Sequence, residues 1–254
     1  MPTTVDPFPL PLRVRSPLAA GVAAAAVAAA LVAGPLGAGA DAAQAQVVAV
    51  DEGSFVVTRA GAVVGREEFR IVRQPSAGGT AFVARAVGAY GARRVLPALQ
   101  AGPDGGPVRY QVDVRGAGAE ERVSGQGSAS GHFAAQVQRG GREGAREYLL
   151  APGTVVADDD AYHQLYFVAR RAMAGATRVP VLVPRTDAQL TVVVTRAGAE
   201  PVTIAGRAIP ATHFALADAG AGWRRDVWVD GEGRVLRVVV PGLGLDATRE
   251  DPPR

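Results

Sequence analysis

Hydrophobic and polar residues alternate in short segments along most of the chain from residue 47 onward. Gly, Asp and Pro separate these segments, and a period of two is typical of antiparallel strands that bury one face. We therefore predict a mainly β protein. The predicted strands cover residues 54–59, 64–73, 80–90, 93–99, 107–115, 119–126, 131–138, 145–150, 180–184, 189–196, 201–204, 211–217, 223–229 and 234–240.

One stretch changes to a helical period, and it predicts a helix over residues 159–174. Its apolar residues recur every three or four positions and form a core-facing stripe. The stripe consists of Tyr162, Leu165, Tyr166, Ala169, Ala172 and Met173. His163, Gln164, Arg170 and Arg171 lie on the opposite, polar side, and Phe167 falls in the middle of that side.

The segment order predicts one domain with a processed N-terminus. Arg13 and Arg15 precede an apolar run at 18–33, and small residues follow at 43–45, as in a signal peptide. The run is short and rich in Ala, so we expect cleavage and no stable transmembrane anchor. We thus predict a signal peptide at 1–45, a single β-rich domain at 46–245 and a flexible tail at 246–254. The expected location is the periplasm or the extracellular space.

Composition narrows the function classes. All 27 basic residues are Arg, but the net charge is only +3 and the arginines are spread along the chain. This pattern does not indicate a nucleic-acid groove. The chain has no Cys, which excludes disulfides, thiol catalysis and cysteine-ligated zinc. We expect no cofactor.

The stretch "VVADDDAYHQLYFVARRA", residues 155–172, concentrates the candidate chemistry. Asp158 is interpreted as the helix N-cap, with Asp159 and Asp160 at the positive end of the helix dipole. Asp159 and His163 are also four residues apart, so they are weak candidates for half of a metal site. A metal needs further ligands from distant strands, and capping alone accounts for the aspartates. We therefore predict no metal site.

Other candidates carry weaker signals. "SGQGSASG" at 124–131 lacks the spacing of a nucleophile elbow, and we predict no catalytic residues, although a hydrolase with an unassigned site stays open. Phe167, Trp223 and Trp228 are weak candidates for a partner surface. A position in the core or at the rim of a hairpin explains these three residues as well.

Three stretches of the second half carry a resemblance. "LLAPGTVVADDDAYHQLYFVARR", "VPVLVPR" and "VWVDGEGRVLRVVVPGLGLDATRE" follow one another over about residues 148–250. In this order they resemble uncharacterised exported bacterial proteins of the periplasmic lipoprotein-carrier-like type. The resemblance implies an incomplete β-barrel, a strongly curved antiparallel sheet or half-barrel wrapping one amphipathic helix.

The resemblance also implies a function. Lipoprotein carriers take up acyl chains in the concave side of the sheet. We accordingly expect a non-enzymatic protein that binds a lipid or a lipoprotein acyl chain. The ligand-binding residues of this hypothesis are Tyr162, Leu165, Tyr166, Ala169 and Met173. The alternative is a cell-envelope protein-protein interaction module without a ligand cavity.

Overall fold

The computed structural model describes residues 47–254, apart from residues 78, 117, 119, 219 and 221. The predicted signal peptide at 1–45 lies outside the described residues. Within the described ranges, no helix has both the length and the apolar character needed to cross a membrane.

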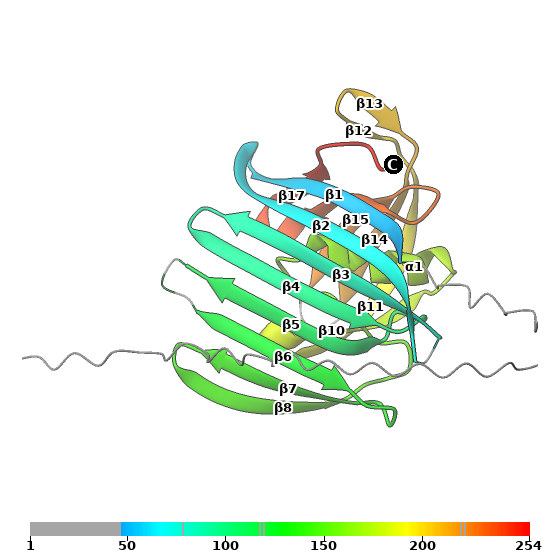
Figure 1. Cartoon of the computed structure of the whole chain (residues 1–254). Coiled ribbons are helices and arrows are strands. Elements are labelled where there is room, and N and C mark those ends of the chain that lie inside the picture. Colours follow the sequence, from blue (N-terminus) through cyan, green and yellow to red (C-terminus); the bar gives the residue numbers. More distant parts are fainter. Residues whose placement is uncertain (1–46, 78, 117, 119, 219, 221) are drawn as a thin grey trace, which may run out of the picture. The chain divides into compact units, whose positions relative to one another are not determined.

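The first eight strands form a meander in which neighbours in sequence are neighbours in the sheet (Figure 1). They are β1 (Val48–Arg59), β2 (Ala62–Ser76), β3 (Gly79–Tyr90), β4 (Arg93–Ala101), β5 (Pro107–Arg115), β6 (Glu121–Gly127), β7 (His132–Arg139) and β8 (Arg142–Leu149). Every strand predicted in this half is present, and all except β5 have shifted ends. In β2 the buried positions Gly65, Glu67, Phe69 and Ile71 alternate with exposed ones, as a period of two requires.

The second half begins with the helical region and then returns to the same sheet. Its elements are β9 (Val155–Val156), η1 (Tyr162–Gln164), α1 (Leu165–Met173), β10 (Arg178–Val183), η2 (Pro184–Thr186), β11 (Ala188–Ala199), β12 (Val202–Ile204), β13 (Arg207–Ile209), β14 (Thr212–Asp218), β15 (Arg224–Val229), β16 (Val235–Val240), η3 (Pro241–Leu243) and β17 (Leu245–Arg249). Pattern reading missed β9, β13 and β17. The first two are very short, and β17 falls mostly in the range expected to be a tail.

Most strands belong to one 15-stranded sheet, ordered β8-β7-β6-β5-β4-β3-β2-β1-β17-β16-β15-β14-β11-β10-β9. All its pairs are antiparallel except β9 with β10. The prediction of a mainly β fold with a curved antiparallel sheet is confirmed, and the described residues contain one α-helix, which is short. The sheet is open, with β8 and β9 at its two ends.

The last strand joins the two halves of the sheet. β17 pairs with β1 on one side and with β16 on the other. Arg249 on β17 is buried and forms an ion pair with the buried Asp51 on β1. The predicted flexible tail at 246–254 is therefore wrong for 246–249, because these residues form a strand inside the sheet.

The helical region packs against the inner face of this sheet. The predicted helix at 159–174 is shorter than expected, because the chain forms a 3₁₀ turn, η1, before α1 begins at Leu165. α1 contacts β9, β10, β15 and β16. It shares one core cluster with inner side chains of β1 to β8, such as Phe55, Phe82 and Val112.

Candidate functional site

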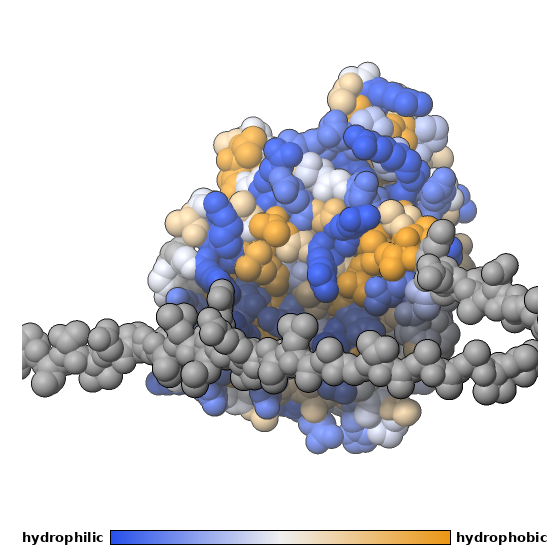
Figure 2. All heavy atoms as spheres, in the orientation of Figure 1, coloured by the Kyte–Doolittle hydropathy of each residue, from blue (hydrophilic) through white to orange (hydrophobic). Residues whose placement is uncertain are grey.

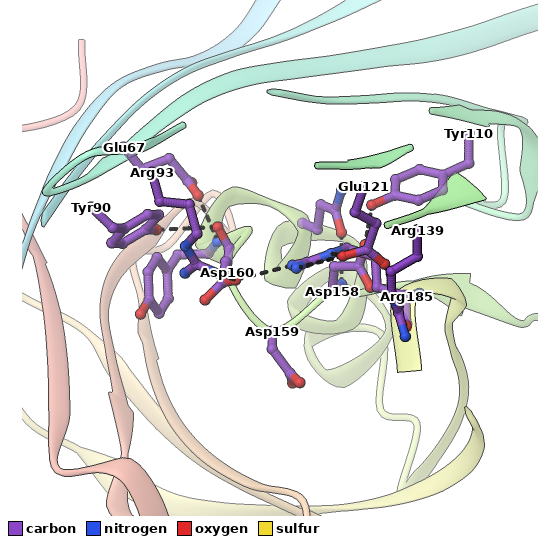
Figure 3. A network of polar contacts seen from close by, with 12 residues as sticks. Glu67, Tyr90, Arg93, Tyr110, Glu121, Arg139, Asp158, Asp159, Asp160 and Arg185 are labelled. Atoms are coloured by element: carbon purple, nitrogen blue, oxygen red, sulfur yellow. Dashed lines mark hydrogen bonds and ion pairs between the residues drawn. The ribbon is translucent and has the colours of Figure 1, made fainter. Parts of the chain in front are cut away.

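The segment from Asp158 to Met173 enters the inner side of the sheet, and we call it the inner segment. Figure 3 shows its aspartates between two groups of residues, with Glu67, Tyr90 and Arg93 on one side and Tyr110, Glu121, Arg139 and Arg185 on the other. The three aspartates have different sets of partners, although Arg185 contacts both Asp158 and Asp160. Each ties the inner segment to a different part of the sheet.

The Asp158 carboxylate does not bond to the helix. Its carboxylate accepts a hydrogen bond from the Tyr110 hydroxyl on β5, and the Arg185 amide donates to it at 3.4 Å. Gln164 occupies the N-cap position of α1, and no side chain caps that helix. The predicted N-cap role of Asp158 is wrong, because its carboxylate is used in a long-range contact.

Burial governs the ionisation of this pair. It raises the pKa of Asp158 to about 6, and the bonds from Tyr110 and Arg185 offset part of that rise. Burial, followed by the neighbouring Asp158 carboxylate, raises the pKa of Tyr110 well above its usual value. The tyrosine is thus the proton donor of the pair.

Asp159 and Asp160 form ion pairs with arginines from separate elements. Asp159 lies 2.7 Å from Nη2 of Arg225 on β15. Asp160 lies 3.0 Å from Nη1 of Arg93 on β4 and 3.0 Å from Nη1 of Arg185. These charges balance locally instead of acting on the helix dipole.

His163 is buried beside a glutamate that sequence reasoning did not single out. Glu67 on β2 accepts from the His163 amide at 2.8 Å, from His163 Nδ1 at 3.0 Å and from the Tyr162 amide at 3.0 Å. The His163 ring also stacks on Phe69 with centroids 5.9 Å apart. Free amides at a helix start need acceptors, and here a distant strand supplies the acceptor for η1.

Asp159 and His163, the weak candidates for half of a metal site, do not share a partner. Asp159 pairs with Arg225, and His163 bonds to Glu67. Among the described residues, no group of three or more His, Cys, Asp or Glu side chains is arranged to hold a metal ion. The expected place of His163 and Gln164 on a polar side is wrong, because both are buried.

Tyr90 fixes the acidic turn from a further direction. Its hydroxyl donates to the Asp160 carbonyl at 3.2 Å. The ring fits against two glycines, since a Cβ on Gly65 would lie 2.2 Å, and one on Gly88 2.9 Å, from ring atoms of Tyr90. Gly65 and Gly88, which have no side chains, therefore leave room for the Tyr90 ring.

Most of the predicted apolar stripe is packed. Tyr162, Leu165, Tyr166 and Ala169 are buried in the main core, whereas Met173 is 42% exposed and does not belong to it. Phe167 is also buried, with its ring 6.0 Å from that of Phe82. The predicted polar side thus carries a core residue, and Phe167 does not form an exposed partner surface.

The two tryptophans are likewise not exposed. Trp228 stacks on His213 with centroids 4.2 Å apart, and it packs in a second cluster with residues of the β12–β13 hairpin. Trp223 is buried with the Arg225 guanidinium 4.7 Å from its ring. Burial contradicts a partner surface made of Trp223 and Trp228, since Trp223 belongs to the main core and Trp228 to the second cluster.

Surface pockets lie away from η1 and α1. Three of them, of about 510, 400 and 410 Å³, are lined by residues of β2 to β8 and their turns. None of these three includes a residue of η1 or α1. The ligand-binding residues that the carrier hypothesis names line none of them.

The partners of the inner segment were missed because they come from separate strands. Glu67 did leave a signal, since it occupies an inward position between Gly65 and Phe69 in an alternating strand. A charged residue in such a position needs a buried partner. Tyr110, Arg185 and Arg225 have no comparable local signal.

Comparison with known proteins gives a limited result. No protein-family model matches the chain, and no curated protein matches it. Among solved structures, the chain is similar to the "Beta-barrel-like Protein of Domain of Unknown Function DUF1849 from Brucella abortus", with a TM-score of 0.45 and 13% identity. The match covers 81% of this chain and 96% of that one.

Proposed function

We propose that this protein is a non-enzymatic interaction module of the cell envelope, which offers its surface to a partner protein. One observation carries the proposal: buried or half-buried polar groups hold the inner segment inside the sheet. These anchors come from β2, β3, β5, β15 and η2, through Glu67, Tyr90, Tyr110, Arg225 and Arg185.

The anchoring argues against a hinged lid over an acyl-chain cavity. To admit an acyl chain on the inner face, α1 would have to leave its place and separate Glu67 from His163 and Tyr110 from Asp158. Each buried polar group left without its partner costs about 1–3 kcal/mol. Displacement of α1 would add several of these costs. Lipid uptake remains the alternative outcome of the test below.

Burial also argues against acid-base catalysis at the most suggestive pair. His163 and Glu67 would be a reasonable base and its orienting carboxylate, but both side chains have 0% exposure. A general base must come within hydrogen-bond reach of its substrate. In this arrangement the pair serves to hold η1.

The envelope location is part of the proposal and depends on the predicted signal peptide at 1–45. Fusion of this segment to a reporter that is active only after export tests the location. Loss of reporter export on replacing the apolar run at 18–33 with polar residues is the expected result. Export that does not need this run contradicts the prediction.

Native mass spectrometry and amide hydrogen exchange test the proposal itself. Protein purified from a bacterial envelope should carry no acyl chain, and added palmitate should leave its mass and its exchange unchanged. Amides of residues 162–168 should exchange only through global unfolding. The variant Tyr110→Phe should speed this exchange clearly more than Tyr148→Phe, which loses only a half-buried bond to Asp187.

A stoichiometric acyl chain contradicts the interaction module and supports the carrier hypothesis. The carrier hypothesis is also supported if residues 162–168 open at a free energy well below that of global unfolding, because a lid must open without unfolding the sheet.

A further inference from the structure

Among the residues that the structure describes, no strand pairs with the outer edge of the strand at one end of the sheet. β8 pairs with β7 on one side and stands at the end of the strand order (Figure 1). The strand has eight residues, which span roughly 26 Å. The other end of the sheet, β9, has two residues, and both are buried.

β8 is also exposed on both faces. Residues 142–147 are all exposed, and Tyr148 is the buried exception. Figure 2, in the orientation of Figure 1, shows mainly hydrophilic atoms along this lower margin of the sheet. A long edge with unpaired backbone groups is a template for a further strand.

Charges of both signs follow one another along this edge. Arg142, Glu143, Arg146 and Glu147 lie in the sequence Arg-Glu-Gly-Ala-Arg-Glu. Arg146 lies on the inner face, where its Nε is 2.8 Å from Asp187. Glu147 lies on the outer face, where it bonds to His132 at 2.9 Å. Even-numbered residues of β8 thus point inward, and odd-numbered ones point outward.

This order disfavours pairing between two copies of β8. A two-fold axis through an antiparallel pair runs normal to the sheet, so opposite residues share a face and their numbers add to an even sum. Four such registers pair at least four residues of β8. They place Arg142 opposite Arg146, Glu143 opposite Glu147, Arg146 opposite its own copy, or Glu147 opposite its own copy. Like charges directly opposite each other are destabilising.

We propose that the β8 edge binds an extended segment of a different protein by strand addition, and that charge order selects the segment. An antiparallel strand from N- to C-terminus meets Glu147, Arg146, Ala145, Gly144, Glu143 and Arg142 in turn. The complementary order is therefore basic, acidic, two uncharged residues, basic, acidic. Main-chain hydrogen bonds supply affinity, and the alternate side chains supply selectivity.

The inference rests on the proposed function and names its surface and partner class. It is tested with two labelled peptides of identical composition and opposite charge order, Lys-Glu-Val-Thr-Lys-Glu and Glu-Lys-Val-Thr-Glu-Lys. Fluorescence polarisation with the purified protein measures their affinities. The first peptide, paired antiparallel, should bind about tenfold more tightly or better, because four antiparallel cross-strand pairs change sign between the two. The second peptide matches the β8 charges only when it runs parallel, which is the less stable pairing.

A charge-reversed protein provides the matched control. The variant with Arg142→Glu, Glu143→Arg, Arg146→Glu and Glu147→Arg keeps the net charge, and the positions that it changes are exposed. It should prefer the second peptide by a similar factor. Peptide binding should also slow amide exchange along β8 in both proteins.

Equal affinities, no measurable binding or an unreversed preference each overturn the inference. Self-association of the protein that protects the β8 amides from exchange at high protein concentration overturns it as well. These results differ from failure of the proposed function, which is signalled by a bound acyl chain or by lid-like opening of the inner segment.

Discussion

Glu67 on β2 accepts hydrogen bonds from both the amide and the ring Nδ1 of His163, and the side chains of both residues are fully buried. The two positions are 96 residues apart, so this contact forms only when the meander closes around the inner segment. It therefore links the start of η1 to the pairing of the first strands.

Removal of the Glu67 carboxylate should be among the most destabilising single changes. Glu67→Ala leaves the amides of Tyr162 and His163 and the His163 ring without their acceptor. We expect a loss of about 3–5 kcal/mol in the free energy of unfolding. Urea denaturation measures it. Glu68→Ala is the control because the Glu68 side chain is 68% exposed, and it should change stability by less than about 0.5 kcal/mol.

A loss below about 1 kcal/mol for Glu67→Ala would show that the carboxylate is not the cap of η1. Glu67→Gln should fall between the two variants, since one amide oxygen remains to accept.

Asp158 should make the protein more stable at mildly acidic pH. Its folded pKa of about 6 lies above the ordinary 3.8 because of burial, so the folded state binds this proton more tightly than the unfolded state. Its contribution to stability is then fully present below about pH 4 and is lost as pH rises through about 6. In Asp158→Asn, the change in the free energy of unfolding between pH 4 and pH 6 should be smaller by roughly 1–3 kcal/mol.

Thermal unfolding at several pH values checks this, and Asp187→Asn is the control. Hydrogen bonds from Tyr148 and Arg146 lower the pKa of Asp187, so its contribution disappears only as pH falls below the ordinary value. The slope between pH 4 and 6 should therefore stay unchanged in this control. An equal change of slope in both variants contradicts the assignment to Asp158.

The sequence predicted the strands well and the site poorly, for physical reasons. Alternation is local, so β5 is found with its observed bounds at 107–115. The partners of Asp158 and His163 come from β5 and β2, and their contacts depend on sheet register. The N-cap interpretation failed because the Asp158 carboxylate bonds to a buried long-range partner, Tyr110, instead of to the amides of the helix that follows it. Phe167 was misplaced because α1 is enclosed on several sides, and only its last turn, with Arg170, Arg171 and Met173, reaches solvent.

Gly65 should resist replacement by alanine. A Cβ there would lie 2.2 Å from the Tyr90 ring and 2.9 Å from the Ala89 carbonyl oxygen, so the ring must leave its place. Gly65→Ala should destabilise the protein by about 1–3 kcal/mol. Gly144→Ala on β8 is the control, because a Cβ there meets only the end of the Arg146 side chain at 3.8 Å.

The double variant Gly65→Ala, Tyr90→Ala separates ring displacement from backbone effects. If the ring causes the cost, adding Gly65→Ala to Tyr90→Ala should cost less than it does in the original protein. Strict additivity in denaturation measurements would place the cost in the backbone near Ala89 instead.

Arg249 should matter more than its place near the end of the chain suggests. Its guanidinium bonds to buried Asp51, donates from Nε to the Val235 carbonyl at 2.6 Å, and lies 5.0 Å from the Phe69 ring. Burial raises the pKa of Asp51, while Arg249 lowers it. Arg249→Met leaves a buried carboxylate unpaired, and we expect a loss of about 3–5 kcal/mol near neutral pH. The loss should shrink at low pH, where Asp51 takes up a proton.

Two further variants test whether the ion pair causes this loss. Arg249→Met combined with Asp51→Leu should recover part of the stability. Arg237→Met, which breaks a half-exposed pair with Asp246, should cost at most about 1 kcal/mol. Equal costs for Arg249→Met and Arg237→Met would show that the contact between β17 and β1 does not depend on this ion pair.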